Sequence, residues 1–194
     1  MPPSRNILFD LDGTLSDPGL GIAHSLQHAL RSCGAAPPPE DELRWCVGPP
    51  LREIFARLLP PLPGHPQVDH DQVERAIAFY LERYAHGGAA ESRAYPGVAE
   101  MLATLSEASR LYLVTAKNTE IAERILTALA LRPHFDGVVG TELDGRFRDK
   151  GDAVRFIVQQ KRLAPPATVV VGDREHDIAA GRRNGLLTVG VTYG

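Results

Sequence analysis

Short apolar runs alternate with amphipathic segments along most of the chain. Runs that are typical of buried strands occupy residues 7–9, 111–114, 137–139, 169–171 and 187–191. Between the later runs, apolar residues recur at helical spacing within 98–105, 121–129 and 153–157. Buried strands that alternate with amphipathic helices form parallel sheets with right-handed crossovers. The pattern therefore predicts an α/β fold in which helices flank a parallel sheet.

The alternation stops in one long stretch, residues 16–94. No apolar run there is typical of a strand, and the spacing of apolar residues predicts helices over 20–30 and 51–59. A third helix is indicated by residues that would share one face: Val73, Ile77, Leu81 and Tyr84. We therefore expect an all-helical domain, 16–94, inserted into an α/β domain made of 1–15 and 95–194. The alternative is that these helices form one more layer of a single domain.

Composition and charge narrow the classes of function. The chain is 43% hydrophobic and 23% charged, which is typical of a globular protein. Its net charge of −3 excludes the broad basic field that binds nucleic-acid polymers or membrane surfaces. Cys33 and Cys46 are too few for a disulfide framework and lack the spacing of a metal site. Residues 1–9 do not resemble a signal peptide, and no apolar run approaches the roughly 20 residues that span a bilayer, so we expect a cytoplasmic protein.

Polar residues follow the predicted strands at their carboxyl ends, where open parallel sheets bind ligands. Asp10 and Asp12 come directly after the first strand. A carboxylate such as Asp10 can attack a phosphoryl group, and a second one, Asp12, can protonate the leaving group and later activate water. Gly13 allows the tight turn that the loop needs. The alternative for this segment alone is an ordinary acidic turn.

Two further predicted strand–helix junctions carry groups that suit a phosphate. Thr115 follows the strand 111–114, and its hydroxyl and the next backbone N–H groups, beginning at Ala116, can hold phosphate oxygens. Lys150 opens a helix at the positive end of the helix dipole, so an anionic partner would explain its place. The alternatives are that Thr115, Asn118 or Thr119 only caps its helix, and that Lys150 is a solvated surface lysine.

Asp173 and Asp177 follow the strand 169–171, at a turn from strand to helix. Such a pair suits Mg²⁺, which takes few carboxylates and completes its coordination with water and phosphate oxygens. The alternative is that Asp173 caps the helix and Asp177 is solvated. Each of these polar clusters is ambiguous alone, but all are expected at the same edge of the sheet. Together they indicate phosphoryl chemistry.

The order of these residues resembles the phosphatase branch of the haloacid dehalogenase superfamily. The matching motifs are Asp10-x-Asp12-Gly13-Thr14, Thr115, Lys150 and Gly172-Asp173-xxx-Asp177. The resemblance implies a Rossmann-like core and an inserted helical cap domain of the C1 type. Because dehalogenases lack the acid that stands here as Asp12, removal of a halogen is not expected.

The resemblance also implies a role for each matching residue. Asp10 would be the nucleophile and a Mg²⁺ ligand, and Asp12 would be the general acid/base with its backbone carbonyl on the metal. Thr115 would donate a hydrogen bond to the transferring phosphoryl group, and Lys150 would neutralise charge on Asp10 and the phosphate. The metal site would be completed by two more acids, Asp173 as a direct ligand and Asp177 in support.

Within the superfamily, the chain resembles the phosphoglycolate phosphatase and bacterial 5′-nucleotidase-like group. The similar segments are 9–17, 47–51, 140–145 and 191–194. In that group the cap loop around Gly48 helps to form the substrate pocket, and Arg52 would meet an anionic part of the substrate. The alternative for Arg52 is a surface arginine on an amphipathic helix. Ala116 and Asn118 are the other candidate substrate-binding residues.

The expected activity is Mg²⁺-dependent hydrolysis of a small phosphomonoester through an aspartyl-phosphate. The substrate would be a small phosphorylated metabolite, phosphoglycolate-like or a nucleoside 5′-monophosphate. Two alternatives stay open: a phosphomutase that acts on a sugar phosphate, and a phosphoester-binding protein without turnover. The helical domain is expected to open for the substrate and to close against bulk water.

Overall fold

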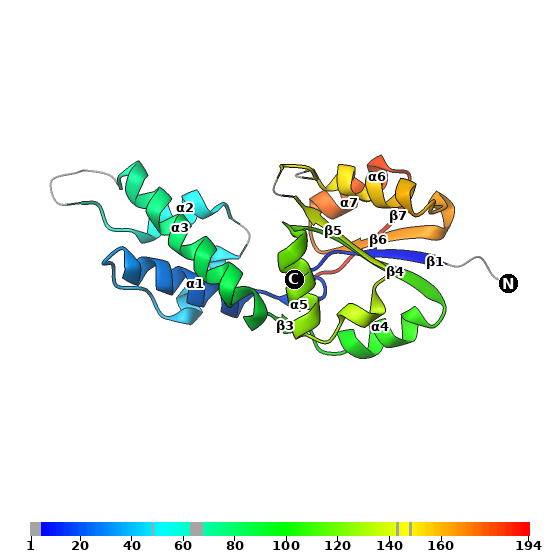
Figure 1. Ribbon diagram of the computed structural model, residues 1–194, viewed down its shortest axis with the longest axis horizontal. Helices are drawn as coiled ribbons and strands as arrows, with labels where there is room; N and C mark the ends of the chain where they lie inside the picture. The colour runs from blue at the N-terminus through cyan, green and yellow to red at the C-terminus, as the bar shows by residue number, and fades with distance from the viewer. Residues whose placement is uncertain (1–4, 48, 63–67, 143, 148) are drawn as a thin grey trace. The chain divides into compact units, whose positions relative to one another are not determined.

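The computed structural model describes residues 5–47, 49–62, 68–142, 144–147 and 149–194 (Figure 1). The chain divides into two compact units, one made of Met1–Asp17 and Arg93–Gly194 and the other of Pro18–Ser92. The first unit alternates strands and helices, whereas helices dominate the second. None of the described helices combines the length and the apolar character that crossing a membrane requires.

A parallel sheet with the strand order β5-β4-β1-β6-β7 forms the centre of the first unit. Its strands are β1 (Arg5–Phe9), β4 (Ser109–Asn118), β5 (Gly137–Thr141), β6 (Thr168–Gly172) and β7 (Leu187–Gly190). The chain adds β4 and β5 on one side of β1 and then β6 and β7 on the other. Open parallel sheets bind ligands at the carboxyl ends of the strands where the strand order changes direction in this way.

The register of the sheet brings the ends of its three central strands to one level. Phe9 of β1 stands beside Leu113 of β4 and Val171 of β6. The polar segments that follow these strands are therefore neighbours in space, although about 160 residues separate the first from the last.

Helices cover both faces of the sheet, with α6 (Lys150–Gln160) and α7 (Glu175–Arg183) on one face and α4 (Val98–Ser106) and α5 (Thr119–Ala128) on the other (Figure 1). A buried apolar cluster joins α6 and α7 to the sheet, and it includes Leu8, Tyr112, Val114, Val154, Ile157, Val170 and Ala180. The predicted α/β class, a parallel sheet flanked by helices, is confirmed.

Some residues of the apolar pattern do not lie in this core. Met101 of α4 is 37% exposed, because Val98 and Leu102 form the buried face of that helix. Leu187 and Val189 are exposed on β7, which is an edge strand and has no neighbouring strand on its outer side among the described residues. β4 also continues beyond the predicted end at Thr115, to Asn118.

Three α-helices make up most of the second unit: α1 (Gly19–Ser32), α2 (Leu51–Leu58) and α3 (His70–His86). Short 3₁₀ turns accompany them, η1 (Glu40–Cys46) and η2 (Gly88–Glu91), as η3 (Arg132–His134) and η4 (Pro165–Ala167) do in the first unit. α3 buries its Val73, Ala76, Tyr80 and Tyr84 side chains. The prediction that Leu81 shares the buried face is wrong, since Leu81 is 52% exposed. The buried face is formed instead by Tyr80 and Tyr84, whose rings are stacked on each other.

Residues 16–94 also contain two strands that the apolar pattern did not predict. β2 (Ser16–Asp17) pairs antiparallel with β3 (Arg93–Ala94). Strands of two residues are too short to show an alternating pattern in the sequence. Their pairing places both segments with the sheet unit, so the second unit spans 18–92 and not the expected 16–94.

Candidate active site

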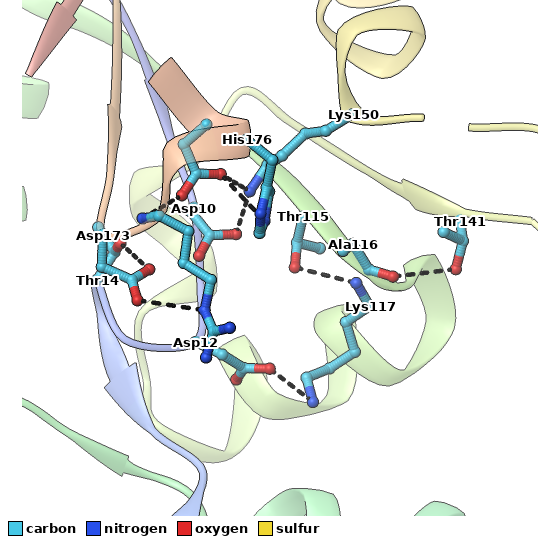
Figure 2. A network of polar contacts seen from close by, with 12 residues as sticks. Asp10, Asp12, Thr14, Thr115, Ala116, Lys117, Thr141, Lys150, Asp173 and His176 are labelled. Atoms are coloured by element: carbon cyan, nitrogen blue, oxygen red, sulfur yellow. Dashed lines mark hydrogen bonds and ion pairs between the residues drawn. The ribbon is translucent and has the colours of Figure 1, made fainter. Parts of the chain in front are cut away.

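The loop that leaves β1 carries the first two acids of the site. The Asp10 N–H still donates to the Val171 carbonyl at 2.9 Å, so Asp10 is anchored at the edge of the sheet. The Leu11 carbonyl then accepts the N–H groups of residues 15 and 16 at 2.8 and 2.9 Å, which closes a tight turn. Gly13 adopts a φ of +85° within it. The turn places both acids beyond the end of β1, where Asp10 lies near Lys150 and Asp12 near Lys117 (Figure 2).

Lys150, the first residue of α6, reaches into the same place. Asp149 caps this helix by accepting the Asp152 N–H at 3.2 Å, so the first turn of α6 is fixed. The Lys150 ammonium lies 2.5 Å from an Asp10 carboxylate oxygen and also pairs with Asp177. Only 7% of Lys150 is exposed, so the alternative of a solvated surface lysine is wrong.

Burial dominates the electrostatics of Asp10. Desolvation raises the pKa of its carboxyl from 3.8 to about 6, and the nearby carboxylates of Asp177 and Asp12 push it in the same direction. The Lys150 ammonium opposes this rise. A buried carboxylate beside two others requires positive charge nearby, and Lys150 supplies part of it.

Asp173 and Asp177 complete an acidic cluster with Asp10. Asp177 is fully buried, and one of its oxygens accepts the Arg174 N–H at 3.0 Å, so the alternative that Asp177 is solvated is wrong. Asp173 accepts a hydrogen bond of 3.3 Å from the Thr14 hydroxyl. Oxygens of Asp10, Asp173 and Asp177 all lie within 4.8 Å of one another. An all-carboxylate set of this size fits a hard divalent cation such as Mg²⁺.

The end of β4 contributes Thr115 and a residue that the sequence analysis missed, Lys117. The Thr115 hydroxyl oxygen accepts the Lys117 N–H at 3.2 Å, which leaves the hydroxyl hydrogen free to donate to a ligand. The Lys117 ammonium lies 2.8 Å from an Asp12 carboxylate oxygen (Figure 2). No local signal identifies Lys117 in the sequence, because it lies beyond the predicted strand 111–114 and the regular alternation of side chains along β4 is interrupted between Val114 and Asn118.

The candidate substrate-binding residues have different surroundings. Gly48 lies outside the described residues. Arg52 on α2 is exposed, with Glu74 at 2.8 Å and His70 at 3.2 Å. Ala116 is exposed, and its carbonyl accepts the Thr141 hydroxyl at 3.4 Å. Asn118 caps α5 and donates to the Thr141 carbonyl at 3.2 Å, so its alternative role as an N-cap is confirmed.

Replacing Gly13 by Ala should damage the site beyond the cost of its backbone strain. A non-glycine residue at positive φ costs about 1–2 kcal/mol of stability, and a Cβ on Gly13 would also collide with the Asp173 carboxylate. Gly97→Ala is the matched control, because Gly97 has a φ of +80° and a Cβ added there would meet nothing within 4 Å. Denaturant unfolding should show a larger loss of stability for Gly13→Ala, and assays of phosphate-ester turnover should show a loss for that variant only. Equal losses in both assays would show that the contact with Asp173 is unimportant.

Comparison with known proteins identifies relatives along nearly the whole chain. A family model described as haloacid dehalogenase-like hydrolase matches residues 7–191. A 5′-nucleotidase of Pseudomonas aeruginosa is 36% identical over 97% of this chain and 83% of that protein. The tyrosine-protein kinase PtkA of Mycobacterium tuberculosis is 35% identical over 97% of this chain, which spans 62% of its length. Phosphoglycolate phosphatase 1 of Pseudomonas aeruginosa is 27% identical over 98% of this chain and 70% of that protein.

Comparison with solved structures points to the same family. A solved hydrolase of the haloacid dehalogenase-like family from Streptococcus pneumoniae has a TM-score of 0.81 and 29% identity, over 100% of this chain and 87% of that one. The resemblance inferred from the order of the acids, Thr115 and Lys150 is therefore confirmed. The chain belongs to the haloacid dehalogenase-like hydrolase family, as an enzyme of its phosphatase branch that acts on phosphoric monoesters.

Proposed function

We propose that the enzyme hydrolyses a small phosphomonoester in a Mg²⁺-dependent reaction that passes through an aspartyl-phosphate on Asp10. The observation that carries the proposal is the Lys150 ammonium, buried between the Asp10 and Asp177 carboxylates. A buried carboxylate that keeps an ammonium partner and has a second acid two residues away is equipped for nucleophilic attack followed by proton transfer.

The first half of the reaction uses Asp10, Asp12 and Thr115. An Asp10 oxygen attacks the phosphorus, the bond from phosphorus to the ester oxygen breaks, and Asp12 gives its proton to the departing alcohol. The Thr115 hydroxyl donates to an oxygen of the phosphoryl group in transfer. In the second half, Asp12 accepts a proton from water, and that water attacks the phosphorus and releases Asp10 and inorganic phosphate.

Positive charge makes this attack possible, because a carboxylate and a phosphate dianion repel each other. Lys150 holds an ammonium against Asp10 throughout. Asp10, Asp173 and Asp177 would hold Mg²⁺, with the Asp12 backbone carbonyl as a further oxygen ligand. When bound, the ion supplies charge stabilisation for the phosphoryl oxygens.

The second unit stays a predicted cap domain that takes part in choosing the substrate. The substrate contacts of Gly48, Arg52, Ala116 and Asn118 stay predictions as well, and so does the cytoplasmic location. The phosphomutase differs from the phosphatase in the acceptor of the phosphoryl group, a sugar phosphate instead of water. A binding protein without turnover would have no use for Asp12 beside Asp10.

Release of free phosphate from a panel of monoesters tests the proposal. The panel contains phosphoglycolate, several nucleoside 5′-monophosphates and hexose phosphates, each assayed with Mg²⁺ and with EDTA. We expect release that depends on Mg²⁺ and strongly favours one class of ester. Isomerised sugar phosphate with little free phosphate would favour the mutase. Binding of an ester by folded protein, without release, would favour the binding protein.

A further inference from the structure

A bulge in β4 brings Lys117 to the active site. Val114 pairs with Val139 of β5, and the next pair is Asn118 with Thr141, so β4 holds two more residues than β5 between these pairs. Such an insertion bends the strand and redirects its side chains. The bulge sits at the carboxyl end of β4, where Thr115 enters the site.

Contacts from β5 fix the shape of this bulge. The Lys117 carbonyl packs directly on Gly140, where a Cβ would collide with it. The Thr141 hydroxyl donates to the carbonyl of Ala116 at 3.4 Å, and the Gly140 N–H donates to the Thr119 hydroxyl at 3.0 Å. The backbone that carries Lys117 is therefore held in place before any ligand binds.

The pair of Lys117 and Asp12 differs from an ordinary surface ion pair. The Lys117 side chain is only 12% exposed and that of Asp12 is 30% exposed, with 2.8 Å between the Lys117 Nζ and the Asp12 Oδ2. The other oxygen, Asp12 Oδ1, is buried and accepts no hydrogen bond from the residues that the structure describes. Lys117 thus holds one oxygen of the carboxyl, and this contact fixes the orientation of the Asp12 side chain.

We infer that Lys117 is the positioning residue of the acid/base Asp12: its ammonium fixes the carboxyl, through Oδ2, in the orientation from which Asp12 protonates the leaving-group oxygen. The inference rests on the proposed function, in which Asp12 protonates the departing alcohol. A lysine that instead bound the phosphate directly would improve the binding of every phosphomonoester alike. The two roles therefore differ in how the effect of a substitution depends on the leaving group.

Aryl phosphates of graded leaving-group basicity separate these roles. p-Nitrophenolate leaves with little help from an acid, whereas phenolate needs a proton. For Lys117→Met we expect kcat/KM on phenyl phosphate, which reports the steps up to release of the phenol, to fall about 10- to 100-fold. This is less than the roughly 10²- to 10⁴-fold that a general acid contributes, because Asp12 is displaced and not removed. The kcat/KM on p-nitrophenyl phosphate should change by less than about 3-fold, because that leaving group needs little proton transfer. Slower hydrolysis of the aspartyl-phosphate, in which Asp12 acts as the base, would lower kcat for both esters alike and does not enter kcat/KM. Lys117→Arg should restore part of the loss on phenyl phosphate.

Three further variants make the test specific. Lys161→Met removes an exposed lysine at the end of α6 and should change kcat/KM on neither ester. Asp12→Asn should show the same dependence on the leaving group as Lys117→Met. The double variant should have a kcat/KM little below that of Asp12→Asn, since both changes disable one step. Circular dichroism confirms that each variant is folded.

Distinct outcomes overturn the inference and the proposed function. If the wild-type enzyme releases phosphate but Lys117→Met lowers kcat/KM equally on the two aryl esters, Lys117 does not position Asp12. Full activity of Lys117→Met on phenyl phosphate also overturns the inference and leaves the proposed function standing. If the wild-type enzyme hydrolyses none of the panel esters or aryl phosphates, the proposed function fails and the inference fails with it.

Discussion

Replacing Asp10 by Asn is expected to lower kcat by about 10⁴-fold or more, because losing a covalent nucleophile removes the first step of the reaction. Asparagine matches the carboxyl in size but offers no oxygen that can form an acyl phosphate of the required kind. The measurement is phosphate release from the best ester of the panel with saturating Mg²⁺. Asp41→Asn, which changes an exposed acid of the second unit in the same way, should keep full activity. Substantial Mg²⁺-dependent turnover by Asp10→Asn would remove Asp10 as the nucleophile.

The same substitution should make the metal-free protein more stable at high pH. The pKa of Asp10 is about 6 in the folded protein, above the ordinary value of 3.8. The folded state therefore binds this proton more tightly than the unfolded state, and the stability that it contributes is present below pH 4 and lost as the pH rises through 6. A rise of this size corresponds to a loss of roughly 3 kcal/mol above pH 6. Asp10→Asn avoids this loss, although asparagine bonds less strongly to Lys150, so roughly 3 kcal/mol is an upper limit.

Unfolding by urea in EDTA, at pH 5 and at pH 8, measures this effect. Asp10→Asn should gain stability relative to the wild type at pH 8 and gain much less at pH 5. A variant that is less stable than the wild type at pH 8 would show that the pairing with Lys150 outweighs the cost of burying the Asp10 charge. Functional sites commonly lower the stability of the fold, so a gain in stability on removing the Asp10 charge would agree with a role of Asp10 in chemistry.

The sequence was most informative where chemistry follows a regular element. Asp10 and Asp12 stand directly after a short buried strand, and Lys150 and Asp177 lie in the first turns of helices that follow β5 and β6. Strand ends in a parallel sheet meet at one edge, so local position alone indicates that these side chains are neighbours. The buried face of α3 was harder to predict, because the neighbouring residues Tyr80 and Leu81 are both largely apolar. Packing of Tyr80 against Phe55 and Tyr84 places Tyr80 on the buried side of the helix.

Lys117 shows why part of the site could not be predicted. Its contact with Asp12 depends on a bulge in β4. The bulge in turn depends on how β4 pairs with β5, and on a glycine at position 140 that lets the Lys117 carbonyl approach closely. None of these relations has a local signal near Lys117. Asn118 shows a different limit: a polar residue before a helix is as suitable for a cap as for a ligand contact, and here its amide serves the cap.

Replacing Lys150 by Met should be the most destabilising single change in the site. Lys150 pairs with Asp10 and Asp177, and both carboxylates are buried. Removing one partner of a buried ion pair costs about 3–5 kcal/mol, because a buried charge is left without compensation. We expect a loss of this size in urea unfolding at pH 8 in EDTA, together with the loss of phosphatase activity. Lys161→Met, at an exposed position, should be neutral in both assays.

The dependence of this stability loss on pH and Mg²⁺ shows whether Lys150 stabilises the fold through its charge or through the packing of its side chain. Without Lys150, the already raised pKa of Asp10 rises further, so the folded variant takes up a proton as the pH falls and recovers stability. The deficit relative to the wild type should therefore be larger at pH 8 than at pH 5. Mg²⁺ at the Asp10, Asp173 and Asp177 carboxylates should stabilise the variant more than it stabilises the wild type, because it restores positive charge to the cluster. Activity should stay low even then, since the ammonium that faces the Asp10 oxygen in the wild type is still missing. A deficit that changes with neither pH nor Mg²⁺ would mean that Lys150 stabilises the fold by filling space.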